Sequence, residues 1–428
     1  MSLCIDCIKT PPQGFFNYHN TLMPLPNILE PETPFLGLAP FLRLSIAGTD
    51  LLPISQTLLE QTQHNPDDAN LWMNLSIIMQ CLGQRDIGLA MQTQALALKR
   101  TYRLPAPLYP PKICLLILVT PGDIATNTPL DCLLEGSDID LIFFYLDQSS
   151  QLSLVPEHDA VMVAIGDSDE NRDLLSDLVH ALAFWPKPVI NTPQNIPLTD
   201  RATNSLLLQN ITGLFIPPTF RINRVALQAI SSGVNHLSEL FVNADFPLIL
   251  RPVGSQAGRD LAKITCPAAI SSYLDSVTDS VFFLSPFIDY SSKDGLFRKF
   301  RVVLINGQPF ICHMAISSHW MVHYVNAGMY EDASKRDEEA KFMTNFDVFV
   351  DRHRLVFTKI HERLKLDYFC IDCAETSSGE LLVFEMDHVM VVHAMDPTDL
   401  FPYKQLPMQR VQQAFREFLI ESVTEALL

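Results

Sequence analysis

The most regular hydrophobic pattern lies between residues 111 and 195, where apolar runs alternate with stretches of mixed character. Three runs are almost continuously apolar: Ile113–Val119, Ile139–Tyr145 and Ala160–Gly166. Such runs are typical of strands that are buried on both faces of a parallel sheet. Asn171–Phe184 has the pattern of a helix, and Val189-Ile190 is a further short strand. Repeated strand–helix units predict an α/β domain with a small parallel sheet covered by helices.

Residues 50–104 have helical spacing instead. Trp72, Leu75, Ser76, Met79 and Ala95 fall at the spacing of large and small residues in one tetratricopeptide (TPR) repeat, a unit of two antiparallel helices and about 34 residues. A solenoid needs about three such units, so the pattern predicts a small all-α TPR-like module. A plain helical hairpin and a peptide-binding repeat both remain open.

Proline-rich segments flank this module. Residues 1–49 are rich in proline and aromatic residues, which predicts an irregular N-terminal arm. Four prolines lie between Tyr102 and Pro111, which marks a domain boundary. The remainder, residues 196–428, mixes long strands with helices.

Charge and hydropathy exclude some classes of partner. The net charge is -18, with 48 acidic against 30 basic residues, which argues against nucleic acid as the main partner. The sequence has no run of about 18 apolar residues, so no membrane span is predicted. The first residues do not have the pattern of a signal peptide. Nine scattered cysteines indicate a reducing compartment, so we expect a cytoplasmic protein. A monomer and a homodimer both remain open.

Two identical tetrapeptides, Cys4-Ile-Asp-Cys7 and Cys370-Ile-Asp-Cys373, raise the question of a four-thiolate zinc site. The second pair lies in an apparent strand, where residues three apart point to opposite faces. This geometry disfavours zinc and leaves Asp372, between the two cysteines, as the better candidate for a function.

A phosphate-binding loop is predicted after the strand that ends at Arg251. The loop Gly254-Ser255-Gln256-Ala257-Gly258 is rich in small residues, which allow backbone N–H groups to approach phosphate oxygens. Arg251 could reach the same phosphates. Alone, a loop with two glycines is a weak signal.

A hairpin near the C-terminus carries three carboxylates. Its strands are Leu366–Ala374, with Asp372, and Leu381–Asp387, with Glu385 and Asp387 two residues apart on one face. Three acids on two apolar strands repel each other unless a divalent cation neutralises them, and hard oxygen ligands select Mg²⁺. We therefore predict a magnesium site at Asp372, Glu385 and Asp387.

Five segments, in this order, resemble the ATP-grasp superfamily, and within it the branch of glutathione synthetase and the ribosomal-protein glutamate ligase. They are Asn191-Thr192-Pro193 with Asp200-Arg201 and Pro217-Pro218-Thr219; Arg251-Pro252 with its loop; Phe283–Ile288; Lys299–Leu304; and the carboxylate hairpin. Arg201 and Arg251 stand where the family has lysine, and Asp387 stands where it has asparagine. The resemblance covers roughly residues 110–390.

The resemblance implies an α+β ATP-grasp fold over residues 196–428, with ATP and Mg²⁺ as ligands. It implies that Arg201, Arg251 and the 254–258 loop bind the nucleotide phosphates, that Phe287 and Ile288 hold adenine, and that Arg301 contacts phosphate during catalysis. The implied activity is a carboxylate–amine ligase that forms an amide through an acylphosphate, on a peptide or small-molecule carboxylate and amine. A kinase of the same fold, or an inactive nucleotide-binding protein that interacts through the TPR-like module, is the alternative.

The substrate side is expected around a histidine-rich stretch between the phosphate strand and the hairpin. It contains His313, His319, Trp320, His323, Tyr324, Asn326 and Met329, and His388 and His393 follow the hairpin. The histidine spacing has no metal-ligand pattern, so a substrate-facing surface is preferred over a metal site. The charged stretch Glu331–Lys341 is expected to be a helix start or a solvated loop without chemistry.

Overall fold

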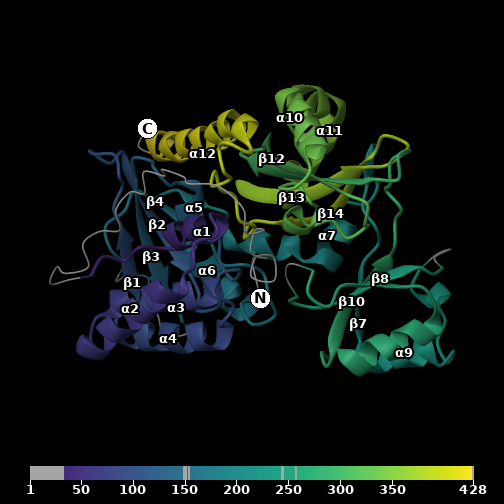
Figure 1. The fold of residues 1–428 in the computed structure, drawn as a ribbon, viewed down its shortest axis with the longest axis horizontal. Helices are drawn as coiled ribbons and strands as arrows, with labels where there is room; N and C mark the ends of the chain where they lie inside the picture. Colours follow the sequence, from purple (N-terminus) through teal and green to yellow (C-terminus); the bar gives the residue numbers. More distant parts are fainter. Residues whose placement is uncertain (1–32, 148–151, 153–154, 242–244, 256–257, 427–428) are drawn as a thin grey trace.

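The computed structural model describes residues 33–147, 152, 155–241, 245–255 and 258–426. The Cys4/Cys7 pair, most of the predicted N-terminal arm, and the loop residues Gln256 and Ala257 lie outside these ranges. Within them, helices accompany three separate sheets, which confirms the predicted α/β class (Figure 1). No helix in the described ranges is long and apolar enough to cross a membrane.

The N-terminal helices pack beside the first sheet, at the left of Figure 1. They are α1 (Ala39–Ile46), α2 (Leu52–His64), α3 (Ala69–Cys81) and α4 (Arg85–Leu98). Asp68 caps α3 by accepting hydrogen bonds from the backbone N–H groups of Asn70 and Leu71. The assignment of this module to the TPR class stays a prediction.

Polar side chains of α3 and α4 hold the loop that follows strand β2 (Ile113–Val119). The Gln92 amide both donates to and accepts from the backbone of Gly122, at 2.9 and 2.8 Å. Gln80 Oε1 accepts from the Ile124 N–H at 3.0 Å, and Arg85 pairs with Asp123 at 2.9 Å. These contacts show that the module braces a neighbouring loop of the α/β domain.

The first sheet has the order β1-β3-β2-β4-β5. Its other strands and its helices are β1 (Thr101–Leu104), β3 (Ile139–Tyr145), β4 (Ala160–Val163), β5 (Val189–Ile190), α5 (Leu130–Leu133) and α6 (Arg172–Leu182). Strands β2 to β5 run parallel and β1 pairs antiparallel with β3. The apolar runs are therefore buried strands, as the sequence predicts.

The second sheet, at the lower right of Figure 1, is antiparallel with the order β7-β10-β8-β9. Its elements are β7 (Phe220–Asn223), α8 (Arg224–Ser231), β8 (Leu248–Pro252), β9 (Ala262–Ile264), α9 (Pro267–Ser276) and β10 (Val281–Pro286). Its buried side chains, among them Leu227, Leu248, Ile270 and Phe282, form a core separate from the rest of the protein.

The third sheet has the order β12-β11-β13-β14-β6, and only β6 pairs in parallel. Its strands are β6 (Leu214–Phe215), β11 (Phe297–Ile305), β12 (Gln308–Ser317), β13 (Tyr368–Glu375) and β14 (Leu381–Asp387). The accompanying helices are α7 (Arg201–Leu207), α10 (Ala333–Thr344), α11 (Phe346–Leu364) and α12 (Gln405–Glu425), with short 3₁₀ turns at Pro193–Thr199, Leu237–Glu239, Tyr324–Asn326 and Pro402–Lys404. The predicted carboxylate hairpin is thus β13–β14.

Asn191 joins the first sheet to the third. Its side chain accepts hydrogen bonds from the N–H groups of Asp367 and Tyr368, both at 2.9 Å, and donates to the Tyr368 carbonyl at 2.8 Å. Its backbone N–H donates to the Asp367 carboxylate at 2.7 Å. Asn191 is fully buried with φ +54°, a conformation that asparagine tolerates. The asparagine of the Asn-x-Pro motif therefore has a structural role, because it connects the first sheet to the third.

We expect Asn191→Ala to destabilise the fold strongly, because it removes three buried side-chain hydrogen bonds and strands their backbone partners. The loss should be about 3 kcal/mol in free energy of unfolding, measured by urea titration. Asn210→Ala is the matched control, since Asn210 also has positive φ (+63°) but is exposed. Equal losses in the two variants would show that only backbone strain matters at Asn191.

Candidate active site

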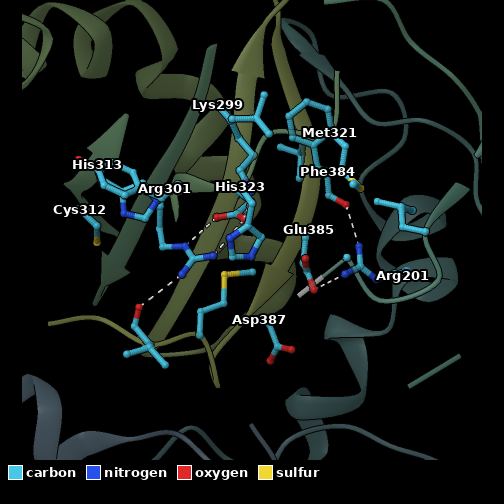
Figure 2. Close-up of a pocket in the computed structure, with 18 of the residues that line it drawn as sticks. Arg201, Lys299, Arg301, Cys312, His313, Met321, His323, Phe384, Glu385 and Asp387 are labelled. Atoms are coloured by element: carbon cyan, nitrogen blue, oxygen red, sulfur yellow. Dashed lines mark hydrogen bonds and ion pairs between the residues drawn. The ribbon is translucent and has the colours of Figure 1, made fainter. Parts of the chain in front are cut away.

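A cavity of about 370 Å³ lies between the second and third sheets. Its polar lining comes from the start of α7 (Arg201), from β8 (Arg251), from β11 (Lys299, Arg301) and from the hairpin β13–β14 (Asp372, Glu385, Asp387). Figure 2 shows several of these side chains pointing toward one another across the cavity. The structure thus brings together all of the predicted arginines and carboxylates.

Arg251 is buried in the cavity wall, with no carboxylate of the described residues at ion-pair distance. Its side chain is held by Ser255, whose hydroxyl accepts from Nε at 3.1 Å and whose carbonyl also accepts from the guanidinium. The residue is 8% exposed, and no acidic oxygen of the described ranges lies within 4.0 Å of it. Burial, with the nearby charge of Arg201, lowers the pKa of Arg251 to about 9. Glu385 compensates the charge of Arg251 only from beyond ion-pair distance, so this buried cation indicates a site for an anion.

Arg201 lies opposite β14 and forms an ion pair with Glu385. It also donates to the Phe384 carbonyl at 3.2 Å (Figure 2). Burial would raise the pKa of Glu385, but the charges of Arg201 and Arg251 outweigh it and lower that pKa. The predicted nucleotide-binding Arg201 therefore already faces one of the predicted metal ligands.

Asp372 is held by two cations from β11. Its carboxylate accepts from Lys299 Nζ at 2.9 Å and from the Arg301 guanidinium at 2.8 and 3.1 Å. Asp372 is 4% exposed, and burial would raise its pKa, yet the two positive charges hold the pKa well below its usual range. A carboxylate paired in this way has less capacity to bind a cation than the sequence pattern predicts.

Asp387 has the opposite environment. Burial, and then the negative charge of Glu385, raise the pKa of Asp387 to about 7, although it accepts a hydrogen bond from the Val389 N–H at 3.2 Å. Glu385 is paired with Arg201, whereas Asp387 has no such cation beside it among the described residues; two carboxylates on one face fit a hard divalent cation. In the described part of the chain, no group of three His, Cys, Asp or Glu side chains is placed to hold a metal. The geometry thus favours a Glu385–Asp387 pair over the predicted trio.

The predicted base-binding side chains, Phe287 and Ile288, line the same cavity. Lys263 Nζ lies 3.4 Å from the centre of the Phe287 ring, and the Trp320 ring meets Phe287 edge-on at 5.7 Å. Of the predicted phosphate loop, Gly258 lines the cavity, and Gly254 and Gly258 both have φ near +75°. This geometry is one that glycine adopts without strain.

The histidine-rich stretch is divided by the structure. His313, Trp320, His323 and Tyr324 line the cavity, and so does His393. Met329 is instead fully buried, and the fully buried His388 ring has Nε2 3.0 Å from the Ile165 carbonyl of the first sheet. Burial lowers the pKa of His323 to about 4 and that of His393 as well, so both rings are neutral at pH 7.

The charged stretch Glu331–Lys341 contains the start of α10, which is one of the two structures expected for it. Glu339 within it is nevertheless fully buried. It accepts from the Met314 N–H at 3.0 Å and from the hydroxyls of Tyr324 and Tyr403 at 2.8 and 2.6 Å, and Lys404 lies 3.5 Å away. Because Met314 lies on β12, its hydrogen bond to Glu339 holds this side chain against the third sheet.

Sequence reasoning missed three lining residues with charge. Lys299 was noted only as part of a strand motif, and Asp396 and Lys404 were not considered. Asp396 and Lys404 lie in loops after the hairpin, where periodicity carries no information. The one signal available was the lysine at the end of Phe401-Pro402-Tyr403-Lys404, directly before an amphipathic helix.

Asp200 positions Arg201. Its carboxylate accepts from the N–H groups of Ala202 and Thr203 at 3.1 and 2.9 Å and so caps α7. It also accepts from the Arg221 guanidinium at 3.2 and 2.8 Å, which ties α7 to β7. Burial would raise the pKa of Asp200, but these hydrogen bonds outweigh it and lower that pKa.

We expect Asp200→Asn to lower the free energy of unfolding at pH 7 by about 1.5–3 kcal/mol, the range for hydrogen bonds to a charged group. Because the folded pKa is depressed, the stabilisation is full above the unfolded value of about 3.9 and is lost as the pH falls through the folded value. The difference between wild type and variant should therefore shrink below about pH 4. Thermal melts from pH 7 to pH 3 test this, with the exposed Asp177→Asn as control. A pH-independent difference would contradict it.

No protein-family model matches the chain. Solved structures to which it is similar include the D-alanine–D-alanine ligase from Bacillus anthracis complexed with ATP (14% identity, 70% of this chain and 98% of that chain, TM-score 0.42). The RimK domain ATP-grasp protein from Sphaerobacter thermophilus (14%, 73% and 99%, 0.41) and the VanG D-Ala:D-Ser ligase from Enterococcus faecalis (12%, 72% and 98%, 0.43) are also similar. The Sphaerobacter thermophilus protein is described as an ATP-grasp protein, the class that the sequence motifs resemble.

Proposed function

We propose that this protein is an ATP-dependent ligase that joins a carboxylate to an amine through an acylphosphate. The observation that carries the proposal is Arg251, a buried guanidinium without a carboxylate partner among the described residues, beside Arg201 and the acid pair Glu385–Asp387. A polyphosphate with a divalent cation satisfies both groups at once. The phosphates neutralise the arginines and the cation neutralises the acids.

The rest of the cavity fits a nucleotide. Phe287 and Ile288 provide an apolar surface for a base, and the glycines at 254 and 258 leave room for phosphate oxygens near Arg251. Glu385 and Asp387 would hold Mg²⁺, which supplies charge neutralisation at the phosphates when bound. Arg201 would then exchange its ion pair with Glu385 for a contact with phosphate.

The reaction proceeds in two displacements. A carboxylate oxygen of the first substrate attacks the γ-phosphorus of ATP, so that an O–P bond forms and the bond to ADP breaks. The amine nitrogen then attacks the acyl carbon; the C–N bond forms, the C–O bond to phosphate breaks, and the phosphate takes the amine proton. Neither step requires a protein nucleophile, because positioning and charge compensation dominate phosphoryl transfer. An enclosed cavity protects the acylphosphate from water.

The substrates remain a peptide or small-molecule carboxylate and amine. Lys299 and Arg301, both near Asp372, lie on the cavity side where the substrate carboxylate would meet the γ-phosphate. The neutral rings of His313 and His323 lie on the same cavity and can donate or accept hydrogen bonds without adding charge.

We expect Arg251→Met to abolish nucleotide binding without weakening the ligand-free protein, because an apolar side chain replaces a buried charge without an ion-pair partner among the described residues. In wild type, MgADP at about 100 times its dissociation constant should add about 2.7 kcal/mol to stability, which a thermal-shift assay detects. The variant should lose this shift and melt at the same or a higher temperature without ligand.

Arg259→Met is the matched control, since Arg259 lies in the same loop with its side chain 45% exposed. It should keep the MgADP shift. If Arg251→Met kept the full shift, the anion site would be misassigned. If wild type showed no shift, nucleotide binding itself would be refuted.

The acylphosphate predicts isotope transfer. With ATP, Mg²⁺ and a panel of amino acids and dipeptides whose carboxylates carry ¹⁸O, active combinations should release phosphate that contains one ¹⁸O atom, measured by mass spectrometry. A kinase acting on a hydroxyl would form ADP and a phosphorylated product without labelled phosphate. An inactive nucleotide-binding protein would form no ADP above a Glu385→Gln control.

A further inference from the structure

A carboxylate outside the proposed nucleotide end, Asp396, also lines the cavity. Its side chain is 13% exposed and lies in the segment that follows β14. The contacts on its oxygens are long: Lys404 Nζ at 3.3 Å and the Tyr330 hydroxyl at 3.4 Å. A carboxylate has about four acceptor positions, so Asp396 retains acceptor capacity toward the cavity.

The lysine beside Asp396 is shared. Lys404 is 2% exposed and lies 3.5 Å from the buried Glu339, donates to the Tyr324 hydroxyl, and covers the rings of Tyr324 and Phe401 at 3.9 and 4.5 Å. One ammonium group therefore faces two carboxylates, Glu339 and Asp396. Glu339 is satisfied by two tyrosine hydroxyls and a backbone N–H, whereas Asp396 faces the cavity.

The surroundings of Asp396 are apolar. Met390, Val391 and Val392 precede it and line the cavity, and Leu42 and Ile46 of α1 line the cavity as well. These five side chains belong to or pack against one hydrophobic core. A ligand group at this end would therefore meet the Asp396 carboxylate and its partner Lys404 among apolar side chains.

We propose that Asp396 binds the ammonium group of the amine substrate and accepts one of its protons, which leaves the free amine nitrogen that attacks the acyl carbon, and that this substrate carries an apolar side chain, as in an amino acid or a peptide with an apolar N-terminal residue. An ammonium donates three hydrogen bonds, which matches a carboxylate with unused acceptor positions. Lys404 fixes the Asp396 carboxylate, and its ammonium group already faces Glu339 and donates to the Tyr324 hydroxyl. The inference rests on the proposed ligase function and specifies its second substrate.

The test measures binding of L-leucinamide by calorimetry, with the protein saturated with Mg²⁺ and a non-hydrolysable ATP analogue. Wild type should bind L-leucinamide, and N-acetyl-L-leucinamide, which lacks the ammonium group, should bind at least about tenfold more weakly. Asp396→Asn should weaken L-leucinamide binding by at least about tenfold and leave the affinity for the ATP analogue unchanged. The comparison of the two amides in wild type needs no variant, so it does not depend on how Asp396→Asn folds.

Asp399→Asn is the matched control, because it makes the same change at an exposed position three residues away, and it should bind L-leucinamide as wild type does. Two outcomes, each with normal binding of the ATP analogue, would overturn the inference and leave the ligase proposal standing. In the first, wild type shows no preference for the free amine; in the second, wild type and Asp396→Asn bind L-leucinamide equally. Failure of wild type to bind the ATP analogue would refute the proposed function and, with it, the inference.

Discussion

The ion cluster of Asp372 with Lys299 and Arg301 is the interaction on which the cavity depends. A buried carboxylate is tolerated only when its charge and hydrogen bonds are compensated, and two cations from the neighbouring strand do this. The pairing of Arg301 opposite Asp372 in the β11–β13 register places them side by side. Loss of the Asp372 carboxylate, or of the Lys299 and Arg301 cations, would leave an unpaired charge in the centre of the third sheet. The floor of the cavity is thus fixed before any ligand binds.

Around this floor the charges are uneven. On the side of the second sheet, Arg251 lacks an acidic partner among the described residues, whereas Asp387 on β14 is a carboxylate whose ionisation is disfavoured. At Asp396, one lysine serves two acids. Each imbalance is tolerable if a ligand of complementary charge occupies the cavity, and in the proposed function the nucleotide would lie at Arg251 and the amine at Asp396.

The sequence predicted those parts of the fold that periodicity records. The apolar runs became β2, β3 and β4, and the carboxylate hairpin became β13–β14, because alternation and turn residues are local signals. Arg251 and the three acids were predicted because a strand end and paired strand positions constrain where their side chains point, whereas Arg201 and Arg301 were predicted only from the resemblance to the ATP-grasp superfamily. Which side chains pair with one another was not predictable in the same way, because it depends on contacts between segments far apart in the chain. Examples are the ion pair of Lys299 with Asp372 and the hydrogen bonds of Tyr324 and Tyr403 to Glu339. Asp396 and Lys404 were missed for the same reason, since loop residues acquire meaning only from what folds against them.

The separate core of the second sheet has a mechanical consequence. The first and third sheets are locked together by Asn191, whereas the chain connects the second sheet to the third through the segments 216–219 and 287–296. Leu227, Leu248, Ile270 and Phe282 pack only within that sheet and its helices, so the unit can rotate as one rigid body without exposing either of the other cores. A rotation about these two segments would have to break the Arg221–Asp200 ion pair between β7 and α7, and it would change the width of the cavity at Arg251 while leaving Asp372 and Asp396 in place. Entry of a nucleotide and release of its product would then be governed by the stiffness of two short connections.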